Sequence, residues 1–313
     1  MFKYILKRIG AAILILLGVS FVLYALLRCM PTDFVEAKIL ALNTSGATVT
    51  EEFKQQMYKT YGLDGSIVQG YFSWLGNICH LNFGKSFINQ REVLSEVFDP
   101  GRIGTSFIVA AVSTVFEFLI AIPLGITAAT HQYSVRDYVV TVLVLVGISL
   151  PSFFFGQLLK DIFANKLGWF PVWSSTSPNY VLPIIALSVY PMAYITRLTK
   201  TSMLDSLNQD YIRTARAKGV PGWKVIFKHA LRNALIPVIT YVGPMVAYIL
   251  TGSMVVENIF TIGGLGSSFV TSITNRDYTM IMATTIFLAI LMVVANLLTD
   301  IAYKFVDPRI TFE

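Results

Sequence analysis

The chain has 313 residues, of which 55% are hydrophobic and only 13% are charged. Soluble domains of this size carry about 25% charged residues, so the composition excludes an ordinary soluble protein and predicts lipid as the solvent for much of the chain. The net charge of +6 is weak evidence for nucleic-acid binding, because membrane proteins carry such an excess in their cytoplasmic loops. We therefore expect membrane lipid, and no nucleic acid, as a partner.

Six segments are apolar over the roughly 20 residues that a membrane span needs. The first, Ile9–Leu27, follows three basic residues and is too long for the core of a signal peptide, so we expect it to be retained. The other five cover approximately residues 103–128, 138–163, 181–198, 235–256 and 280–305. The sequence therefore predicts an all-α polytopic membrane protein with six transmembrane helices.

Basic residues are concentrated in one loop, residues 199–234, between the fourth and fifth spans. By contrast, the short loops on the other side contain only Lys166 and Arg276. Because basic loops stay in the cytoplasm, we expect a multi-pass protein of the bacterial plasma (inner) membrane with both termini cytoplasmic. The expected divisions are a first helix, an extracytoplasmic loop, a five-helix core and a cytoplasmic tail, at residues 1–30, 31–101, 102–306 and 307–313.

The long outer loop contains one clear helix pattern, Thr50–Tyr61. Thr50 is an N-cap residue, the two glutamates after it suit the positive end of a helix, and Gly62 can end the helix. Such a helix can lie on the membrane or on the protein's own rim, or it can dock an external partner. The sequence leaves both interpretations open.

Polar and helix-breaking residues inside the spans are candidates for lining a pathway. Glu117 lies deep in the second span, where a charge costs roughly 2.5–3.5 kcal/mol on insertion scales, so we expect a polar path or a helix contact there. Prolines interrupt the third and fifth spans at Ser149-Leu150-Pro151-Ser152 and Gly243-Pro244, although ordinary kinks remain an alternative. The candidate lining residues are Glu117, Ser149, Pro151, Ser152, Phe153, Pro244, Met245, Thr251, Met254 and Glu257.

Motifs for catalysis or cofactor binding are lacking in the sequence. No spacing of cysteine and histidine is typical of a metal site, so we expect no metal ligands. Gly84-Lys85-Ser86 imitates the end of a P-loop, but Cys79 stands where the first glycine should be. We expect no catalytic residue and no cofactor bound by this chain. Cys29 and Cys79 both fall outside, where they can pair or stay free.

The most informative segment is the basic loop from Asp210 to Gly219. We expect a short helix there, with Asn208 as its cap and Gly219 as its end. A helix of this length is not stable alone in water, so it must pack on something. Contact with anionic lipid is one interpretation, and insertion into a groove of another subunit is the other.

This loop resembles the coupling loop of ABC importer permeases. The match consists of Tyr211–Gly219 followed by Arg232-Asn233-Ala234-Leu235-Ile236-Pro237. Nearly the whole chain is similar to one branch, the B-type permeases of dipeptide, oligopeptide and nickel importers. Further matching segments are Leu6-Lys7-Arg8-Ile9, Tyr61-Gly62-Leu63-Asp64, Asn82-Phe83-Gly84-Lys85-Ser86, Leu167-Gly168-Trp169-Phe170-Pro171, Arg276-Asp277-Tyr278 and Asp307-Pro308-Arg309. The loop departs from the family pattern at two positions, where Arg213 replaces an acidic residue and Thr214 a small one.

The resemblance implies a permease of the type I importer fold that forms a pathway with a second, homologous permease. Two cytoplasmic ABC ATPases would bind ATP and Mg²⁺, and an extracytoplasmic binding protein would deliver the substrate. The residues implied in ATPase coupling are Asp210, Tyr211, Ile212, Arg213, Thr214, Ala215, Arg216, Ala217, Lys218 and Gly219.

Other classes fit the sequence less well. A secondary transporter or channel would favour inverted repeats and paired ionisable residues at mid-membrane, and neither is evident. A membrane enzyme would need a cluster of nucleophile, base or metal ligands. Within the importer class, oligopeptides or dipeptides are the favoured substrate, and nickel or a metal chelate is the alternative.

Overall fold

The computed structural model describes residues 2–45 and 49–306, and within them it contains helices, loops and one isolated bridge between Lys85 and Glu92. Side chains are described except at residues 2–5, 243–244, 246–248, 250–252 and 300–306. The chain forms two compact units, one of Met1–Gly104 with Gly263–Val293 and one of Thr105–Ile262 with the residues from Val294 onward. These units do not follow the predicted divisions, because residues 263–293 group with the N-terminal segments.

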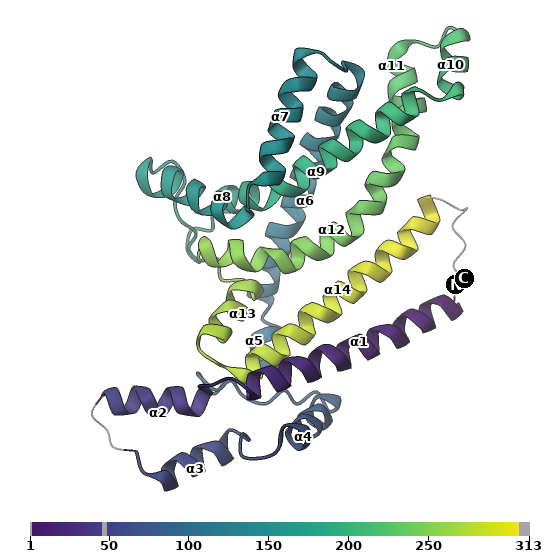
Figure 1. Ribbon diagram of the computed structural model, residues 1–313. Coiled ribbons are helices and arrows are strands. Elements are labelled where there is room, and N and C mark those ends of the chain that lie inside the picture. The colour runs from purple at the N-terminus through teal and green to yellow at the C-terminus, as the bar shows by residue number, and fades with distance from the viewer. Residues whose placement is uncertain (1, 46–48, 307–313) are drawn as a thin grey trace. The chain divides into compact units, whose positions relative to one another are not determined.

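The first unit joins the loop predicted to be extracytoplasmic, called the outer loop, to one end of two long helices. Figure 1 shows α2, α3 and α4 gathered at one end of α1, together with the start of α14. The helices with residues in this unit are α1 (Phe2–Arg28), α2 (Phe34–Thr44), α3 (Glu51–Thr60), α4 (Ile67–Cys79), α5 (Val93–Val97), the start of α6 (Pro100–Thr130, to Gly104), α13 (Leu265–Thr274) and α14 (Tyr278–Val306, to Val293). The prediction of a helix after Thr50 is confirmed: the Thr50 hydroxyl accepts from the backbone N–H of Phe53 at 3.3 Å.

Apolar and polar contacts both hold this unit together. A mainly aromatic and aliphatic core includes Phe34, Met57, Phe87 and Tyr278. Beside it, the buried carboxylate of Asp277 accepts a hydrogen bond from the Ser86 hydroxyl at 2.5 Å and one from the Phe87 backbone N–H at 3.1 Å. These contacts connect positions about 190 residues apart in the sequence. They explain why residues 263–293 group with the outer loop.

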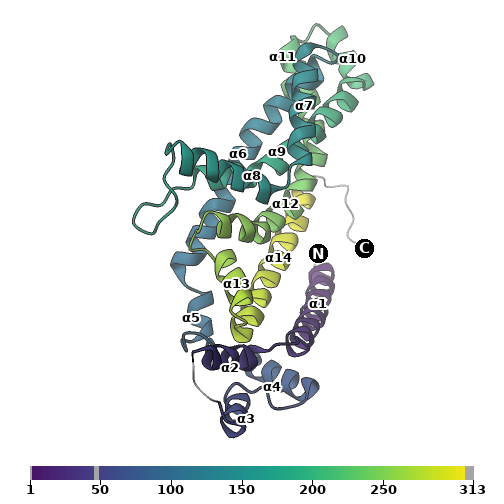
Figure 2. The same cartoon turned by 60° about the vertical axis from the view of Figure 1, so that its left-hand side comes forward.

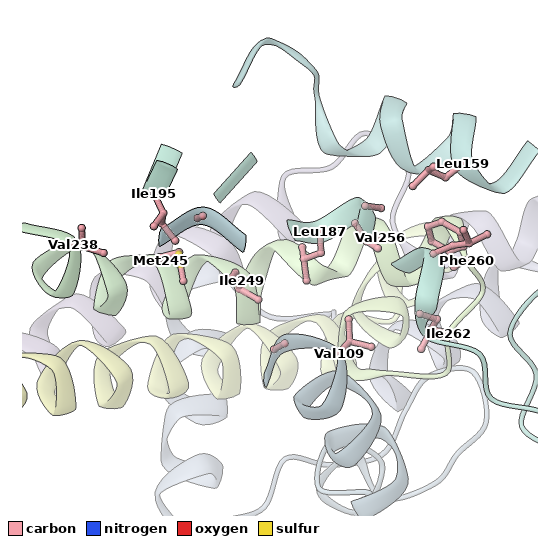
Figure 3. Packing of buried hydrophobic residues seen from close by; sticks show 14 residues of the cluster. Val109, Leu159, Leu187, Ile195, Val238, Met245, Ile249, Val256, Phe260 and Ile262 are labelled. Atoms are coloured by element: carbon pink, nitrogen blue, oxygen red, sulfur yellow. The ribbon is translucent and has the colours of Figure 1, made fainter. Parts of the chain in front are cut away.

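The second unit is built around α9. Its helices are α6 (Pro100–Thr130, from Thr105), α7 (Val135–Ser149), α8 (Ser152–Leu159), η1 (Lys160–Lys166), α9 (Val181–Leu207), α10 (Asp210–Ala217), α11 (Gly222–Lys224), η2 (Val225–Ala230) and α12 (Leu231–Ile259), where η marks a π-helix. The main core combines side chains of α6, α8, α9 and α12, among them Val109, Leu187, Ile195 and Ile249 (Figure 3).

Glycines let neighbouring helices approach α9 closely. A Cβ atom added at Gly125 of α6 would lie 2.6 Å from the Thr199 Cβ and 2.8 Å from the Thr196 backbone oxygen. One added at Gly147 of α7 would lie 2.8 Å from the Ala193 Cβ. Real Cβ atoms do not approach this closely, so both contacts require glycine. Because two helices depend on it in this way, α9 is the structural centre of the second unit.

The third predicted span is broken rather than continuous. α7 and the segment Ser152–Lys166 are bent by 100° at Leu150 and Pro151. Both residues are extended, as expected for a proline and the residue before it, since proline offers no N–H and its ring disfavours helix at the preceding position. The prediction that residues 149–152 interrupt a helix is confirmed, and the span predicted over 138–163 is either a broken span or a re-entrant loop.

Four described helices are long and apolar enough to cross a membrane, and the bent pair can provide a fifth span. The four are Leu6–Arg28, Val93–Thr130, Val181–Leu207 and Tyr278–Thr299. The 29-residue α12 covers the predicted fifth span, although the structure does not describe its side chains at residues 243–244, 246–248 and 250–252. The architecture is that of an all-α polytopic membrane protein, and the count of six spans stays a prediction.

Candidate functional site

The basic loop forms a separate short helix, α10, immediately after α9. α9 continues to Leu207, nine residues beyond the predicted end of the fourth span. Asn208 caps the C-terminus of α9, and Gln209 stands at the N-cap of α10 without a side-chain hydrogen bond. The predicted role of Asn208 as the cap of this helix is therefore wrong, because two helices share the junction and α9 takes that residue.

The predicted end of the helix at Gly219 is confirmed. Gly219 has a φ of +72°, which glycine adopts without steric cost. Its backbone N–H donates to the Arg216 oxygen at 3.0 Å, and the Val220 N–H donates to the Ala215 oxygen at 3.2 Å. These bonds satisfy carbonyls that have no partner within the helix. The chain turns there toward α11, which lies beside α10 in Figures 1 and 2, and then enters η2.

α10 sits on a base of apolar side chains from four neighbouring elements. Its own contributions are Ile212, which is 0% exposed, and Ala215, which is 8% exposed. The base consists of Ile126 and Ala129 of α6, Met203 of α9, Val225 and Ala230 of η2, and Ala234 of α12. Because a helix this short is not stable alone, these contacts fix its position. A displacement of α10 therefore disturbs the apolar cluster that it shares with α6, α9, η2 and α12.

The opposite face of α10 is exposed and mainly basic. Tyr211 is 40% exposed, and Arg213, Arg216 and Lys218 are exposed as well. Asp210 and Arg213 form a surface ion pair at 3.5 Å, which contributes little to stability at such exposure. Thr214 and Ala217 complete this face. The predicted coupling residues thus divide into a buried pair that anchors the helix and an exposed set that is available to another subunit.

Several candidate pathway residues are buried within the single chain. Glu117 and Glu257 are 0% exposed, and Met245 is 1% exposed in the main core. The Glu257 carboxylate accepts a hydrogen bond from Ser253 at 2.9 Å. A pathway between two permeases would be lined by residues that each single chain exposes, so these three do not meet that condition in this conformation.

Other candidates are exposed or half-buried on the single chain. Ser149, Pro151 and Phe153 are exposed at the break between α7 and α8, Phe153 by 56%, while Ser152 and Met254 are half-buried. The side chains of Pro244 and Thr251, and the Asp307-Pro308-Arg309 segment, fall outside the described residues. The lining of a pathway stays a prediction.

Two polar contacts of the membrane core were missed by the sequence analysis. The Lys200 ammonium of α9 forms an ion pair with the buried carboxylate of Asp137 of α7, and it also donates to the Thr141 hydroxyl at 3.1 Å. Lys160 donates to the backbone oxygen of Ile259, where a cation suits the negative end of α12. Their partners lie 59 or more residues away, so no local pattern reveals them. Cys29 and Cys79 are free and exposed.

Comparison with known proteins matches both parts of the chain to transport families. Residues 121–312 match the family "binding-protein-dependent transport system inner membrane component", and residues 1–110 match its N-terminal companion family. The chain is 39% identical to the oligopeptide transport system permease protein AppB of Bacillus subtilis, with 100% of each chain covered. It is 37% identical to the dipeptide transport system permease protein DppB of Lactococcus lactis, with 99% of each covered.

Solved structures support the same fold at low identity. The MetNI methionine ABC transporter, in inward-facing conformations, has a chain that matches with a TM-score of 0.58 and 17% identity, over 69% of this chain and 99% of that one. A chain of an amino acid ABC transporter solved with histidines matches with a TM-score of 0.56 and 13% identity, over 67% and 94%. Together with the apolar helices, these findings show that the chain belongs to the family of integral inner-membrane components of binding-protein-dependent transport systems, the ABC importer permeases.

Proposed function

We propose that this chain is one of two permease subunits of an ATP-driven importer, and that peptides are its substrate. α10 carries the proposal: a short helix, anchored through Ile212 and Ala215, that exposes its other face. Such a helix transmits motion if another protein moves it. The separate ATPase subunits would supply that motion by binding and hydrolysing ATP with Mg²⁺, and this chain would carry no catalysis itself.

The topology of the proposal follows from the basic loop. α10 and its neighbours carry the cluster of lysine and arginine that stays in the cytoplasm. That side is also where ATPases find ATP. The outer loop would then face the extracytoplasmic binding protein, with both termini of the chain in the cytoplasm.

Peptides are preferred as substrate because relatives at 37–39% identity over essentially the full length are named as oligopeptide or dipeptide permeases. Nickel or a metal chelate is the competing substrate. The test below therefore includes both cargoes.

The experiment reconstitutes this chain into proteoliposomes with a second permease, ATPases and a binding protein of the same transport system. ATP-dependent uptake of a labelled peptide is measured alongside uptake of ⁶³Ni²⁺. We expect peptide uptake in the wild type and none in Ala215→Arg or Gly219→Pro, which disturb the anchor and the end of α10, while each variant stays in the membrane. Nickel uptake without peptide uptake would overturn the substrate, and normal peptide uptake in both variants would overturn the role of α10.

A further inference from the structure

The segment around α4 has an unusual composition for an aqueous loop. Residues 65–84 contain no Asp, Glu, Lys or Arg, although charged residues flank them at Asp64 and Lys85. α4 has 13 residues and is therefore about 20 Å long, too short to cross a hydrocarbon layer of about 30 Å. Apolar helices of this length are typical of segments that lie in a membrane interface.

Contacts with α1 place this segment at a definite depth. Arg28, the last residue of α1, donates to the Gly65 backbone oxygen at 2.7 Å, so the segment begins level with the outer end of α1. The Tyr71 hydroxyl then bonds the Leu17 backbone oxygen at 3.1 Å and the Ser20 hydroxyl at 2.9 Å. Leu17 lies about 15 Å along the helix from the end of the apolar run at Leu27. The tyrosine hydroxyl therefore reaches close to mid-span.

Ring contacts place the body of α4 nearer the surface. The Tyr71 ring lies 5.1 Å from the Phe21 ring, and the Trp74 ring lies 6.2 Å from the Tyr24 ring, between centroids. Phe21 and Tyr24 are about 9 Å and 4.5 Å below Leu27 along α1. This range matches the depth of about 5–10 Å at which interfacial helices insert.

The exposed face of α4 suits lipid. Tyr71 is buried against α1, with only 4% of its surface exposed, whereas Val68 and Phe72 are 55% and 63% exposed. Val68 and Phe72 are four residues apart and so lie on one stripe of the helix. With α1 crossing the membrane, this stripe lies at the level of the acyl chains.

We propose that α4 is an interfacial helix immersed in the outer leaflet, and that phospholipid acyl chains are the partner of its Val68–Phe72 stripe. The extracytoplasmic loop predicted at 31–101 is then not wholly aqueous. α4 anchors it to the bilayer surface beside α1. The inference rests on α1 being a membrane span and does not depend on the transported substrate.

Two phenylalanines provide a matched pair for the test. Phe72 of α4 is 63% exposed, and Phe53 of α3 is 46% exposed on a helix that also carries Glu51, Glu52 and Lys54. Phe72→Cys and Phe53→Cys are made in a Cys29→Ser/Cys79→Ser background. The importer is reconstituted in phosphatidylcholine–phosphatidylglycerol vesicles, and labelling by a membrane-impermeant maleimide is normalised to labelling in detergent. We expect the Phe72→Cys variant to react about tenfold or more slowly than Phe53→Cys, because its thiol sits below the headgroups.

A second measurement identifies what protects the thiol. Each variant is labelled with bimane in detergent and reconstituted with lipid that carries a nitroxide high on the acyl chain. We expect strong quenching of the label from Phe72→Cys and little from Phe53→Cys. Equal maleimide rates would overturn the proposal. Protection of Phe72→Cys without nitroxide quenching would also overturn it, because a protein would then cover the stripe.

Discussion

Replacing Ile212 by alanine weakens the anchoring of α10 without changing the residues on its exposed face. Ile212 is 0% exposed and belongs to the same apolar cluster as the base formed by α6, α9, η2 and α12. Isoleucine-to-alanine substitutions at buried sites cost about 2–5 kcal/mol. An eight-residue helix has little stability alone, so most of this cost falls on the docked position of α10. A loss of about 3 kcal/mol changes the ratio of docked to detached helix by about 10².

The assay measures ATP hydrolysis and peptide uptake in the same proteoliposomes. We expect Ile212→Ala to stay in the membrane and to leave ATP hydrolysis measurable, while uptake per ATP falls steeply. Ile212→Val, which costs about 0.5–1.5 kcal/mol, should fall between alanine and wild type. Ile13→Ala is the matched control, because Ile13 is 52% exposed on α1 and removal of its side chain leaves no cavity.

Two outcomes would contradict the anchoring of α10 through Ile212. If Ile212→Ala transports peptide at the wild-type rate per ATP, the apolar base is not what connects α10 to the membrane helices. If Ile13→Ala is as defective as Ile212→Ala, the loss does not arise from α10.

Three other substitutions test the membrane core. Gly125→Ala should lower the free energy of unfolding of the purified protein by about 1–2 kcal/mol, measured by thermal denaturation. Overpacking costs about 1–3 kcal/mol, and alanine recovers up to about 1 kcal/mol in helix propensity. Gly104→Ala is the control in the same helix, because an added Cβ atom there meets open space and should not lower stability. Lys200→Met should cost about 1–3 kcal/mol by the same measurement. This is less than the roughly 3–5 kcal/mol lost when a fully buried ion pair is broken, because the Lys200 side chain is 24% exposed. Adding Asp137→Leu should recover most of the loss, since it removes the unpaired carboxylate. Glu117→Gln should leave substrate-stimulated ATP hydrolysis unchanged, because this buried residue lies about 14 Å along α6 from Ile126 in the base of α10. Loss of stimulation would contradict that.

Features that depend on neighbouring residues were predictable from the sequence. Thr50 caps α3 and Gly219 ends α10 because the relevant hydrogen bonds reach only three to five residues along the chain. The break at Pro151 was also readable, since proline acts on its own turn. The angle of 100° was not, because it is set by what α7 and α8 pack against.

Contacts between distant residues were not predictable in this way. The Asp137–Lys200 ion pair joins α7 to α9, and the Asp277 contacts join α14 to the outer loop. The junction at Asn208 was misread for a related reason: local preference allows a cap for either helix, and the extension of α9 to Leu207 decides between them. Tertiary packing sets the length of α9, and local sequence patterns do not reveal that packing.

The burial of Glu117 bears on where substrate can pass. Its carboxylate is enclosed by one chain, whereas Ser149 at the α7–α8 break is exposed and Ser152 is half-buried. A pathway between two permeases is accessible from each chain's surface, so the break is the better candidate for its wall and Glu117 for a contact inside the helix packing. α9 lies between these features and α10, because it contacts α7 at Gly147 and supplies Met203 to the base of α10. We infer that α9 is the element through which a movement of α10 would reach the break.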